Sequence, residues 1–432
     1  MSRPQAGEAI VIVGAGSIGL CTAYNLAKRS LEESLPINIK VVDAFNQCFA
    51  GPSSNCTGCL HYGFPEPQFP ALPLGKYSFD LWALEADSKA FREITGYRAQ
   101  SSFGIDPGSG HGLDELPDWV KRDSSWDANK EVLGTKTATV NPIRVGDWLT
   151  EQCRSIGVEI QLNTKIVAVD LSTDNRIQAV TCVNHRQETI AIPCVQLLLA
   201  CGAWTPMVFD SLFPSSPIEL QWTTDAGDWA CWKNQCPTTQ ATTAFVSFAN
   251  IAGSKMEFAG RNDGTIWACG RRNLTARLPP PGHQQEPDDM MINELAGYAQ
   301  KWINWQCNCN SISVENNHEN HNSIQLIDKG RAFRPATPSG LPIIDKVSPL
   351  DLTITSTNCN TSLTRESSSG LFVCWGHGSY GLTLGMGSGR LMAQLMFGEK
   401  PDIDLSNFAL GCQSKRVEEK QDGPGRSRCL IL

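Results

Sequence analysis

The chain has 432 residues, which is long enough to bury a large core and to form two or three structural units. Its hydrophobic share of 41% and charged share of 19% are typical of a globular protein. The 36 Lys and Arg residues against 44 Asp and Glu residues give a formal charge of -8, which argues against nucleic-acid binding and favours small-molecule chemistry.

Seventeen cysteines are scattered along the chain, and a protein of this length does not need a disulfide framework. The sequence opens without the charged and apolar regions of a signal peptide. No stretch reaches the roughly 18 apolar residues of a membrane span. These features predict reduced thiols and a cytoplasmic location.

The first predicted elements form a βαβ unit over residues 8–44. The sequence AIVIV predicts a strand, GAGSIG a tight turn, Leu20 to Leu31 a helix, and INIKVVDA a second strand. A strand, a Gly-rich turn and a helix in this order are the context that a dinucleotide-binding motif requires.

Each glycine of this turn has a distinct expected role. Gly14 permits the tight turn, Gly16 lets the backbone approach a pyrophosphate, and Gly19 lets the helix pack closely on the strand. Ser17 and Ile18 complete the turn at the N-terminus of the helix, where N–H groups and a partial positive charge favour phosphates.

Asp43 closes the second strand, where its carboxylate can accept hydrogen bonds from ribose hydroxyls. It follows Gly14 by 29 residues, against a usual spacing of about 20, and the polar insertion SLEESLP accounts for the excess. A helix-capping glycine cluster is the alternative interpretation. The motif by itself leaves NAD and FAD both open as ligands.

The rest of the chain alternates between α/β and antiparallel patterns. Residues 51–73 are rich in Gly, Pro, Ser and Cys and predict a loop, and Leu81 to Thr95 predicts a helix. A helix and several segments of β periodicity follow between residues 141 and 202, and residues 211–330 are typical of an antiparallel sheet. GLFVCWGHG then predicts a strand entering a Gly-rich turn, and Leu384 to Met396 predicts a helix.

Five ordered motifs resemble the D-amino-acid oxidase family of FAD enzymes, over about residues 8 to 410. They are SSNCTGCL, LLLACGAWTP, KMEFAGRNDGTIWACGRR, RAFRPATPSGLPIID and GLFVCWGHGSYGLTLGMGSGRLMAQLMFG. The family includes glycine, sarcosine and D-amino-acid oxidases, and within it the chain is most similar to a fungal and yeast branch.

The resemblance implies an α/β fold, with a discontinuous Rossmann-like FAD-binding domain and an inserted antiparallel-sheet substrate domain. The expected FAD-binding segments are residues 1–75, 141–210 and 331–410. The expected remainder is 76–140 as linking helices of the substrate domain, 211–330 as the substrate domain itself and 411–432 as a flexible tail.

The resemblance also implies how FAD is held. Backbone N–H groups from Gly378 to Leu382 would face the pyrimidine edge of the flavin and stabilise the negative charge that develops there on reduction. The helix opening near Thr383 would point its positive end the same way. His377 and Tyr380 would orient the flavin or the substrate, or would be packed side chains. The further expected FAD contacts are Ser53, Ser54, Thr57, Gly58, Ile166, Gly202, Trp204, Gly378, Gly381, Leu382 and Thr383.

Arg334 matches the arginine that pairs with the substrate carboxylate in D-amino-acid and glycine oxidases. A guanidinium suits this role because its planar fork binds both oxygens of a carboxylate; the alternative is a salt-bridge arginine. Ala332 stands where family members with covalent flavin carry Cys, which implies non-covalent FAD. Ser379 stands where some glycine-oxidase relatives carry a second arginine.

The implied reaction is hydride transfer from a carbon bearing an amine to FAD, with reoxidation by dioxygen and release of peroxide. The substrate would be a small amino acid or amine, in a fungal biosynthetic pathway. Two alternatives remain open. One is a dehydrogenase of a hydroxy acid or amine that uses another electron acceptor, and the other is a flavin-bearing trafficking or regulatory protein with little turnover.

Two short patterns lie outside these motifs. Cys307, Cys309, His318 and His321 resemble metal ligands, but their spacing and Asn-rich surroundings do not match structural zinc sites, so no metal is expected. The final residues, beginning at Cys429, match a prenylation box or arise by chance. One prenyl group would give reversible membrane contact.

Overall fold

The computed structural model describes residues 3–64, 68–130, 136–234, 241–247, 255–305, 325–352 and 368–412. The pattern between Cys307 and His321 and the C-terminal box at Cys429 lie outside the described residues. Within the described ranges, no helix is both long and apolar enough to cross a bilayer. In the same ranges, no group of three or more His, Cys, Asp or Glu side chains could hold a metal ion.

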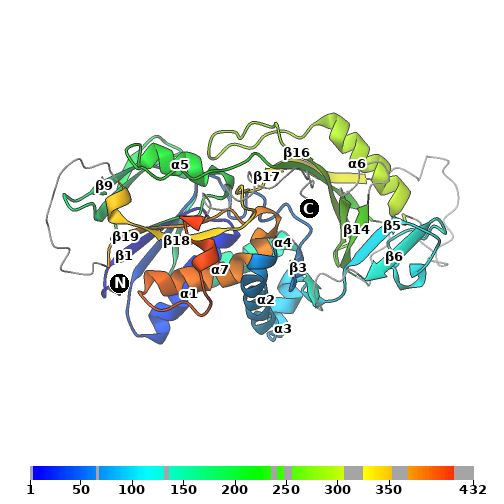
Figure 1. Cartoon of the computed structure of the whole chain (residues 1–432), viewed down its shortest axis with the longest axis horizontal. Helices are drawn as coiled ribbons and strands as arrows, with labels where there is room; N and C mark the ends of the chain where they lie inside the picture. The colour runs from blue at the N-terminus through cyan, green and yellow to red at the C-terminus, as the bar shows by residue number, and fades with distance from the viewer. Residues whose placement is uncertain are drawn as a thin grey trace, which may run out of the picture.

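A six-stranded sheet at one end of the molecule joins segments from the start, the middle and the end of the chain (Figure 1). Its order is β18-β19-β12-β1-β2-β8, and β18 runs antiparallel to the others. This discontinuous parallel sheet confirms the predicted α/β fold. The strands are β1 (Ala9–Val13), β2 (Asn38–Val42), β8 (Glu159–Gln161), β12 (Gln196–Leu199), β18 (Ile343–Val347) and β19 (Gly370–Trp375).

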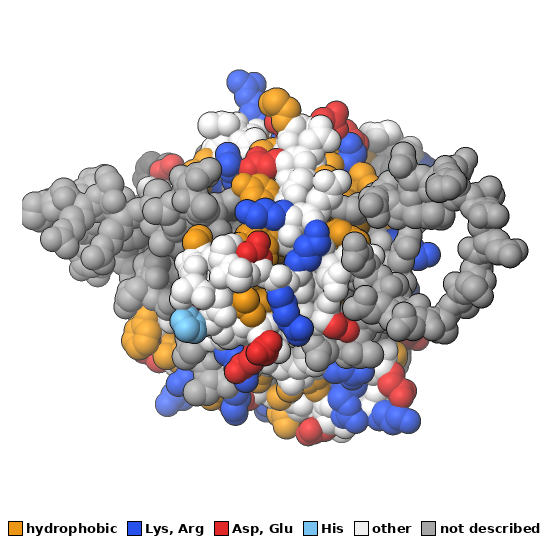
Figure 2. Space-filling view, turned by 90° about the vertical axis from the view of Figure 1, so that its right-hand side faces the viewer, with side chains coloured by type: hydrophobic (Ala, Val, Ile, Leu, Met, Phe, Trp, Pro, Cys, Tyr) orange, Lys and Arg blue, Asp and Glu red, His pale blue; other side chains and the backbone are white. Residues whose placement is uncertain are grey.

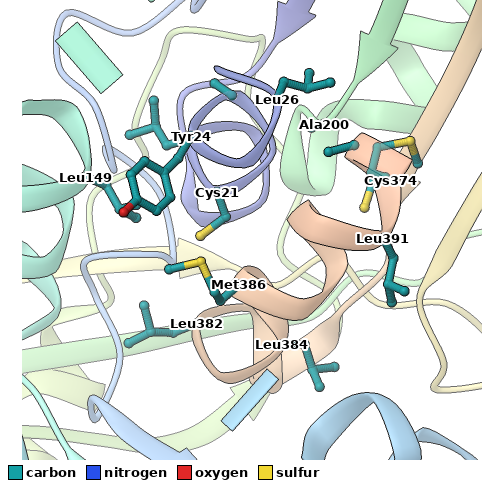
Figure 3. Packing of buried hydrophobic residues seen from close by; sticks show 14 of the residues in the cluster. Cys21, Tyr24, Leu26, Leu149, Ala200, Cys374, Leu382, Leu384, Met386 and Leu391 are labelled. Atoms are coloured by element: carbon teal, nitrogen blue, oxygen red, sulfur yellow. The ribbon is translucent and has the colours of Figure 1, made fainter. Parts of the chain in front are cut away.

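Helices α1 (Ser17–Glu32) and α7 (Gly381–Met396) pack against each other on one face of this sheet. Their backbones approach closely, because a Cβ added to Gly389 would lie only 2.5 Å from the carbonyl carbon of Cys21. Figure 3 shows Cys21 of α1 and Met386 of α7 in the buried core at this contact. Three more helices contribute to the same core: α2 (Leu72–Glu85), α3 (Lys89–Thr95) and α4 (Pro142–Ser155).

The opposite face of the six-stranded sheet is covered by α5 (Thr205–Leu212) and a three-stranded sheet. Side chains alternate along a strand, so Ile10 and Ile12 belong to the helical core whereas Val11 and Val13 belong to the second core. Burial on both faces explains the continuous apolar run of β1. The three strands are β9 (Thr164–Leu171), β10 (Ile177–Asn184) and β11 (Thr189–Pro193).

A seven-stranded sheet forms the other end of the molecule, in the order β17-β13-β16-β15-β14-β5-β6 (Figure 1). Helix α6 (Asp289–Trp302) packs its apolar side on one face of this sheet. Figure 2 views this end and shows Lys, Arg, Asp and Glu side chains interspersed on the surface. The strands are β5 (Phe103–Pro107), β6 (Trp126–Lys130), β13 (Ala226–Lys233), β14 (Thr242–Ser247), β15 (Lys255–Gly260), β16 (Thr265–Asn273) and β17 (Gln325–Phe333). A small third sheet holds β3 (Cys59–His61), β4 (Arg98–Ala99) and β7 (Thr137–Thr139).

Several elements differ from the sequence prediction. The single helix predicted over Leu81 to Thr95 is two helices, α2 and α3, because the Ser88 hydroxyl caps α3 by accepting a hydrogen bond from the N–H of Phe91. Strands β5 and β6 come from residues 76–140, where the sequence analysis names a helix but no strand. Strand β5 pairs with β14 in parallel rather than antiparallel. Helix α6 falls within a region predicted as strands.

Candidate active site

A long cavity of about 1440 Å³, its open mouth included, is lined by residues from both large sheets. One side lies where the parallel strands β1, β2, β12 and β19 end, which is the edge at which open α/β sheets bind ligands. Glu257, Trp267 and Cys269 of the seven-stranded sheet line the other side. The cavity therefore has a wall from each large sheet, and its strand-end side is where a dinucleotide would bind.

The Gly-rich turn has the geometry expected from its sequence. Gly14 has a φ of +112°, and a Cβ there would lie 2.3 Å from the carbonyl oxygen of Ala200, so only glycine fits. A Cβ on Gly19 would lie 1.8 Å from the carbonyl oxygen of Gly14, which confirms the close packing of helix on strand. Of this turn, Gly14, Gly16, Ser17 and Ile18 line the cavity.

Asp43 lies at the end of β2 with both carboxylate oxygens engaged by the backbone. Oδ2 accepts a hydrogen bond from the N–H of Ala15 at 2.5 Å, and Oδ1 accepts one from Phe45 at 2.8 Å. Burial raises the pKa of Asp43, while these two hydrogen bonds act in the opposite direction. The carboxylate is therefore held in one orientation at the cavity wall.

The loop after β2 supplies Ser53 and Thr57 to the cavity. The hydroxyl oxygen of Ser53 also accepts a hydrogen bond from the N–H of Ser17 at 3.0 Å, which ties this loop to the N-terminus of α1. Ser54 lies behind the lining, where its hydroxyl donates to the carbonyl oxygen of Phe49 at 2.6 Å. Ser54 therefore holds the shape of the loop.

Gly58 and Thr383 also lie behind the cavity lining. Gly58 has a φ of +77°, and a Cβ there would lie 2.2 Å from the carbonyl oxygen of Val140. The hydroxyl of Thr383 donates to the carbonyl oxygen of Cys59 at 3.2 Å. Both residues fix the junction of the loop and α7, and a direct contact with the cofactor stays a prediction.

In the turn between β19 and α7, some backbone N–H groups form hydrogen bonds within the protein. The N–H of Gly378 donates to Pro335 at 2.9 Å and that of Tyr380 donates to His377 at 3.0 Å, so these two groups are engaged within the protein. The first turn of α7 begins at Gly381, and its N–H groups lack intrahelical partners by helix geometry. The residues of this turn that line the cavity are His377, Gly378, Ser379, Gly381 and Leu382.

His377 and Tyr380 have the contacts of packed side chains. His377 is buried with Nε2 at 2.9 Å from the hydroxyl of Ser388, and desolvation lowers its pKa to about 3, so the ring is neutral. Tyr380 packs against the rings of Phe64 and His61 at centroid distances of 4.6 and 5.8 Å. These contacts match the packed-side-chain alternative for both residues.

The remaining expected cofactor contacts, Ile166, Gly202 and Trp204, all line the cavity. The indole N–H of Trp204 donates to the carbonyl oxygen of Pro279 at 2.6 Å, and its ring packs edge-on against Phe45. These contacts anchor Trp204, so it forms a fixed part of the wall.

Arg334 lies in the cavity lining with its guanidinium held from two sides. Nη1 donates to Oδ1 of Asp225 at 3.2 Å, and Nη2 lies 3.4 Å from Sγ of Cys269. Asp225 also accepts two hydrogen bonds from Arg272, at 2.9 and 2.6 Å. Burial acts to lower the pKa of Arg334, but the charge of Asp225 raises it, and the net change is upward. One carboxylate thus holds two arginines, and Arg334 is the one of them that lines the cavity.

The model of the family described as "FAD dependent oxidoreductase" (DAO) matches residues 9–395. The chain belongs to this family. Three solved structures share its fold. Glycine oxidase from Geobacillus kaustophilus has a TM-score of 0.64 and 17% identity, covering 93% of this chain and 98% of that one. L-amino acid deaminase from Proteus vulgaris has a TM-score of 0.67 and 16% identity, covering 95% of this chain and 98% of that one. L-proline dehydrogenase from P. horikoshii has a TM-score of 0.66 and 12% identity, covering 96% of this chain and 99% of that one.

The family relationship confirms the resemblance, the FAD cofactor and an oxidoreductase activity. The cavity fits FAD because Gly202 and Gly378 have φ values of +58° and +55°, and a Cβ on either would meet no atom within 4 Å. Their backbones are therefore open to the cavity that both line. The turn at Gly16 would hold the pyrophosphate and Asp43 the ribose. Whether the chain belongs to a fungal branch stays a prediction.

The sequence analysis assigned no individual role to five residues at this site: Asp225, Arg272, Glu257, Trp267 and Cys269. Three of them carry a readable signal. Glu257, Trp267 and Cys269 occupy alternate positions of predicted strands, and period-two alternation places such residues on one face. Asp225 and Arg272 show no such signal, since their role depends on a contact between residues 47 apart in sequence.

Proposed function

We propose that the protein oxidises the C–N bond of a small amino acid or amine, with hydride transfer to non-covalent FAD and release of peroxide. The observation that carries the proposal is Arg334, a cation held at the cavity wall by buried Asp225. A partly buried guanidinium suits a substrate carboxylate because it binds both oxygens and stays charged. Glycine oxidase, L-amino acid deaminase and L-proline dehydrogenase are each named for an amino acid.

The chain's own groups bind and orient the substrate in this reaction. Arg334 holds the carboxylate, and Asp225 with Cys269 holds Arg334, so that the reacting carbon is fixed by orientation. Bound FAD supplies the two-electron acceptor. The substrate carbon loses a hydride and its nitrogen loses a proton, giving an imine that water hydrolyses to a carbonyl compound and ammonia or an amine. Dioxygen takes up the two electrons and two protons as hydrogen peroxide.

The test is anaerobic reduction of the purified flavoprotein by D- and L-amino acids, amines and 2-hydroxy acids, followed as loss of flavin absorbance. We expect amino acids or amines to bleach the flavin, and one peroxide to form per substrate after air is admitted. Bleaching by 2-hydroxy acids alone would contradict C–N oxidation. Bleaching by an amine without peroxide in air would instead show that the electron acceptor is not dioxygen.

A further inference from the structure

A second, smaller cavity adjoins the wall of the large one. Its volume is about 350 Å³, its open mouth included, against about 1440 Å³ for the large cavity. Thr57 lines both cavities, so the loop after β2 forms part of the wall between them. Most of the other lining residues come from β14, from the end of β15 with the turn that follows it, and from residues 139–144 between β7 and α4.

Two side chains of the seven-stranded sheet point to this second cavity. Thr243 of β14 lies directly opposite Ala259 of β15, so their side chains share a face of the sheet. Arg261 follows Ala259 by two residues, and its N–H donates to the carbonyl oxygen of Thr265 at 2.9 Å, so strand pairing continues to Arg261. Alternation along the strand then places Arg261 on the same face as Thr243, and both residues line the second cavity.

The guanidinium of Arg261 is buried with few partners. Arg261 is 7% exposed, and its Nη2 donates to the carbonyl oxygen of Cys56 at 3.3 Å. Among the residues that the structure describes, its Nε has no hydrogen-bond partner. Burial lowers the pKa of Arg261, although the nearby charge of Asp263 acts in the opposite direction. A buried cation with so little compensation is unfavourable unless a ligand supplies the missing partner.

Asp263 lines the second cavity, but its carboxylate is engaged by other groups. Oδ1 accepts hydrogen bonds from the N–H and the hydroxyl of Thr265 at 3.1 and 2.6 Å. Oδ2 accepts one from the side-chain amide of Asn141 at 3.1 Å and lies 3.9 Å from the guanidinium of Arg144. The charged residues of the described lining are therefore two arginines, Arg144 and Arg261, against this one aspartate.

The hydroxyl of Thr243 is the second group that a ligand would satisfy. Thr243 is fully buried, and its Oγ1 has no hydrogen-bond partner within the described ranges. A hydroxyl can donate or accept, whereas a guanidinium only donates, so an acceptor satisfies both groups. Water could accept both hydrogen bonds, but it brings no charge to the buried cation. An anion supplies the acceptor and the charge together.

We propose that the second cavity binds a small inorganic anion of the size of chloride, held by the guanidinium of Arg261 and the hydroxyl of Thr243. Arg261 also donates to Cys56, in the loop that carries Ser53 and Thr57 to the large cavity. An anion that fixes Arg261 therefore also fixes this loop, and FAD should bind more tightly in its presence. The site is independent of the proposed oxidation, because it includes no group that would contact the substrate.

The experiment measures the melting temperature of the FAD-loaded protein against chloride concentration. Sodium gluconate, whose anion is too large for the site, keeps the ionic strength constant. In the natural protein we expect a saturable rise that gives a dissociation constant for chloride. Thr243→Val keeps nearly the same shape and should weaken chloride binding roughly tenfold, the loss expected for one hydrogen bond to a charged group. Arg261→Met should abolish the response.

Arg271→Gln is the matched control, because Arg271 pairs with Glu294 at 3.0 Å and lines neither cavity. Its chloride response should equal that of the natural protein. A melting temperature that does not respond to chloride would overturn the proposal and indicate that water fills the cavity. The same response in Thr243→Val as in the natural protein would also overturn it, and this variant decides the matter if Arg261→Met does not fold.

Two further measurements locate the anion and test its effect on the cofactor. Crystals soaked in sodium bromide should show an anomalous peak within hydrogen-bonding distance of Arg261 and Thr243, and a peak elsewhere only would overturn the site. The dissociation constant for FAD, measured by titrating the flavin-free protein, should be lower in chloride than in gluconate. An equal constant in both salts would overturn the link to the FAD loop.

Discussion

At the scale of single residues, the candidate site depends on a carboxylate that is shared by two arginines. Asp225 is only 2% exposed and accepts hydrogen bonds from Arg272 and Arg334. Removing it would leave two neighbouring cations without their partner, and breaking such buried pairs is strongly destabilising. Removing Arg334 is milder, because Asp225 keeps its two bonds to Arg272.

Arg334→Ala therefore tests the binding role without removing the pair between Asp225 and Arg272. Hydrogen bonds to charged groups are worth about 1.5–3 kcal/mol, so we expect KM for carboxylate substrates to rise roughly 10–100-fold. Steady-state kinetics with an active substrate measure the change, and the exposed Arg271→Ala serves as control. An unchanged KM in Arg334→Ala would show that another group binds the carboxylate.

Two buried histidines make stability depend on pH. Burial lowers the pKa of His377 to about 3 and that of His61 to about 4. Both titrate near 6.5 in the unfolded chain, so between pH 6.5 and these values the unfolded state binds more protons. The free energy of unfolding should fall as the pH drops below 6.5, by roughly 2 kcal/mol per histidine at pH 5.

Urea unfolding at pH 7 and pH 5 measures this dependence. Between pH 7 and pH 5, the free energy of unfolding of His377→Asn should fall by about 2 kcal/mol less than that of the natural protein. The reason is that one of the two buried histidines has been removed. The same loss in both proteins would contradict a depressed pKa for His377.

At the scale of elements, the contact between α1 and α7 joins two segments that lie more than 300 residues apart in the sequence. The N–H of Ser17 at the start of α1 and the turn before α7 both lie at the cavity, so the packing of these helices sets its width. Close packing is possible only where glycine faces the other helix, and Gly389 faces the backbone of Cys21.

Gly389→Val should destabilise the protein by roughly 1–3 kcal/mol, the usual cost of overpacking, because the added Cβ meets backbone that cannot move aside. Gly297→Ala in α6 is the opposite case, since a Cβ there meets no atom within 4 Å. Gly297→Ala should raise the free energy of unfolding by about 0.5–1 kcal/mol. Thermal unfolding compares the two, and equal melting temperatures would contradict this account of the helix contact.

The elements that could be predicted from the sequence are those with a local pattern. The βαβ unit and α7 follow from apolar runs and glycine spacing, although both helices begin three residues before the predicted start. Helix α6 was missed, although Ile292, Leu295, Ala299 and Trp302 repeat at helical spacing after the capping Asp288. Strands β5 and β6 carry less apolar signal, because each ends in polar residues or proline and β6 is the edge strand of the sheet.

The candidate site divides in the same way. Gly14, Asp43 and Arg334 lie in motifs that can be read along the chain, and the structure brings them to one cavity. Asp225 and Arg272 could not be predicted, because their pairing forms between segments that meet only in the folded sheet. Local sequence thus identifies the dinucleotide side of the site better than the substrate side.

At the scale of the whole molecule, the cavity lies where a sheet built from three distant segments meets a second, seven-stranded sheet (Figure 1). The first sheet supplies the Gly-rich turns and the second supplies Glu257, Trp267 and Cys269. This division matches a cofactor bound by one sheet and a substrate bound between the two. It requires FAD to be present, and Ala332 in place of Cys leads us to expect that FAD is held without a covalent bond.

The measurement that tests this most directly is the visible spectrum of the purified protein before and after acid precipitation. We expect flavin absorbance in the native protein and its complete transfer to the supernatant, with FAD as the released compound. Flavin that stays with the precipitated protein would contradict non-covalent binding. A protein that is colourless and binds no added FAD would contradict the central claim that this cavity is a working flavin site.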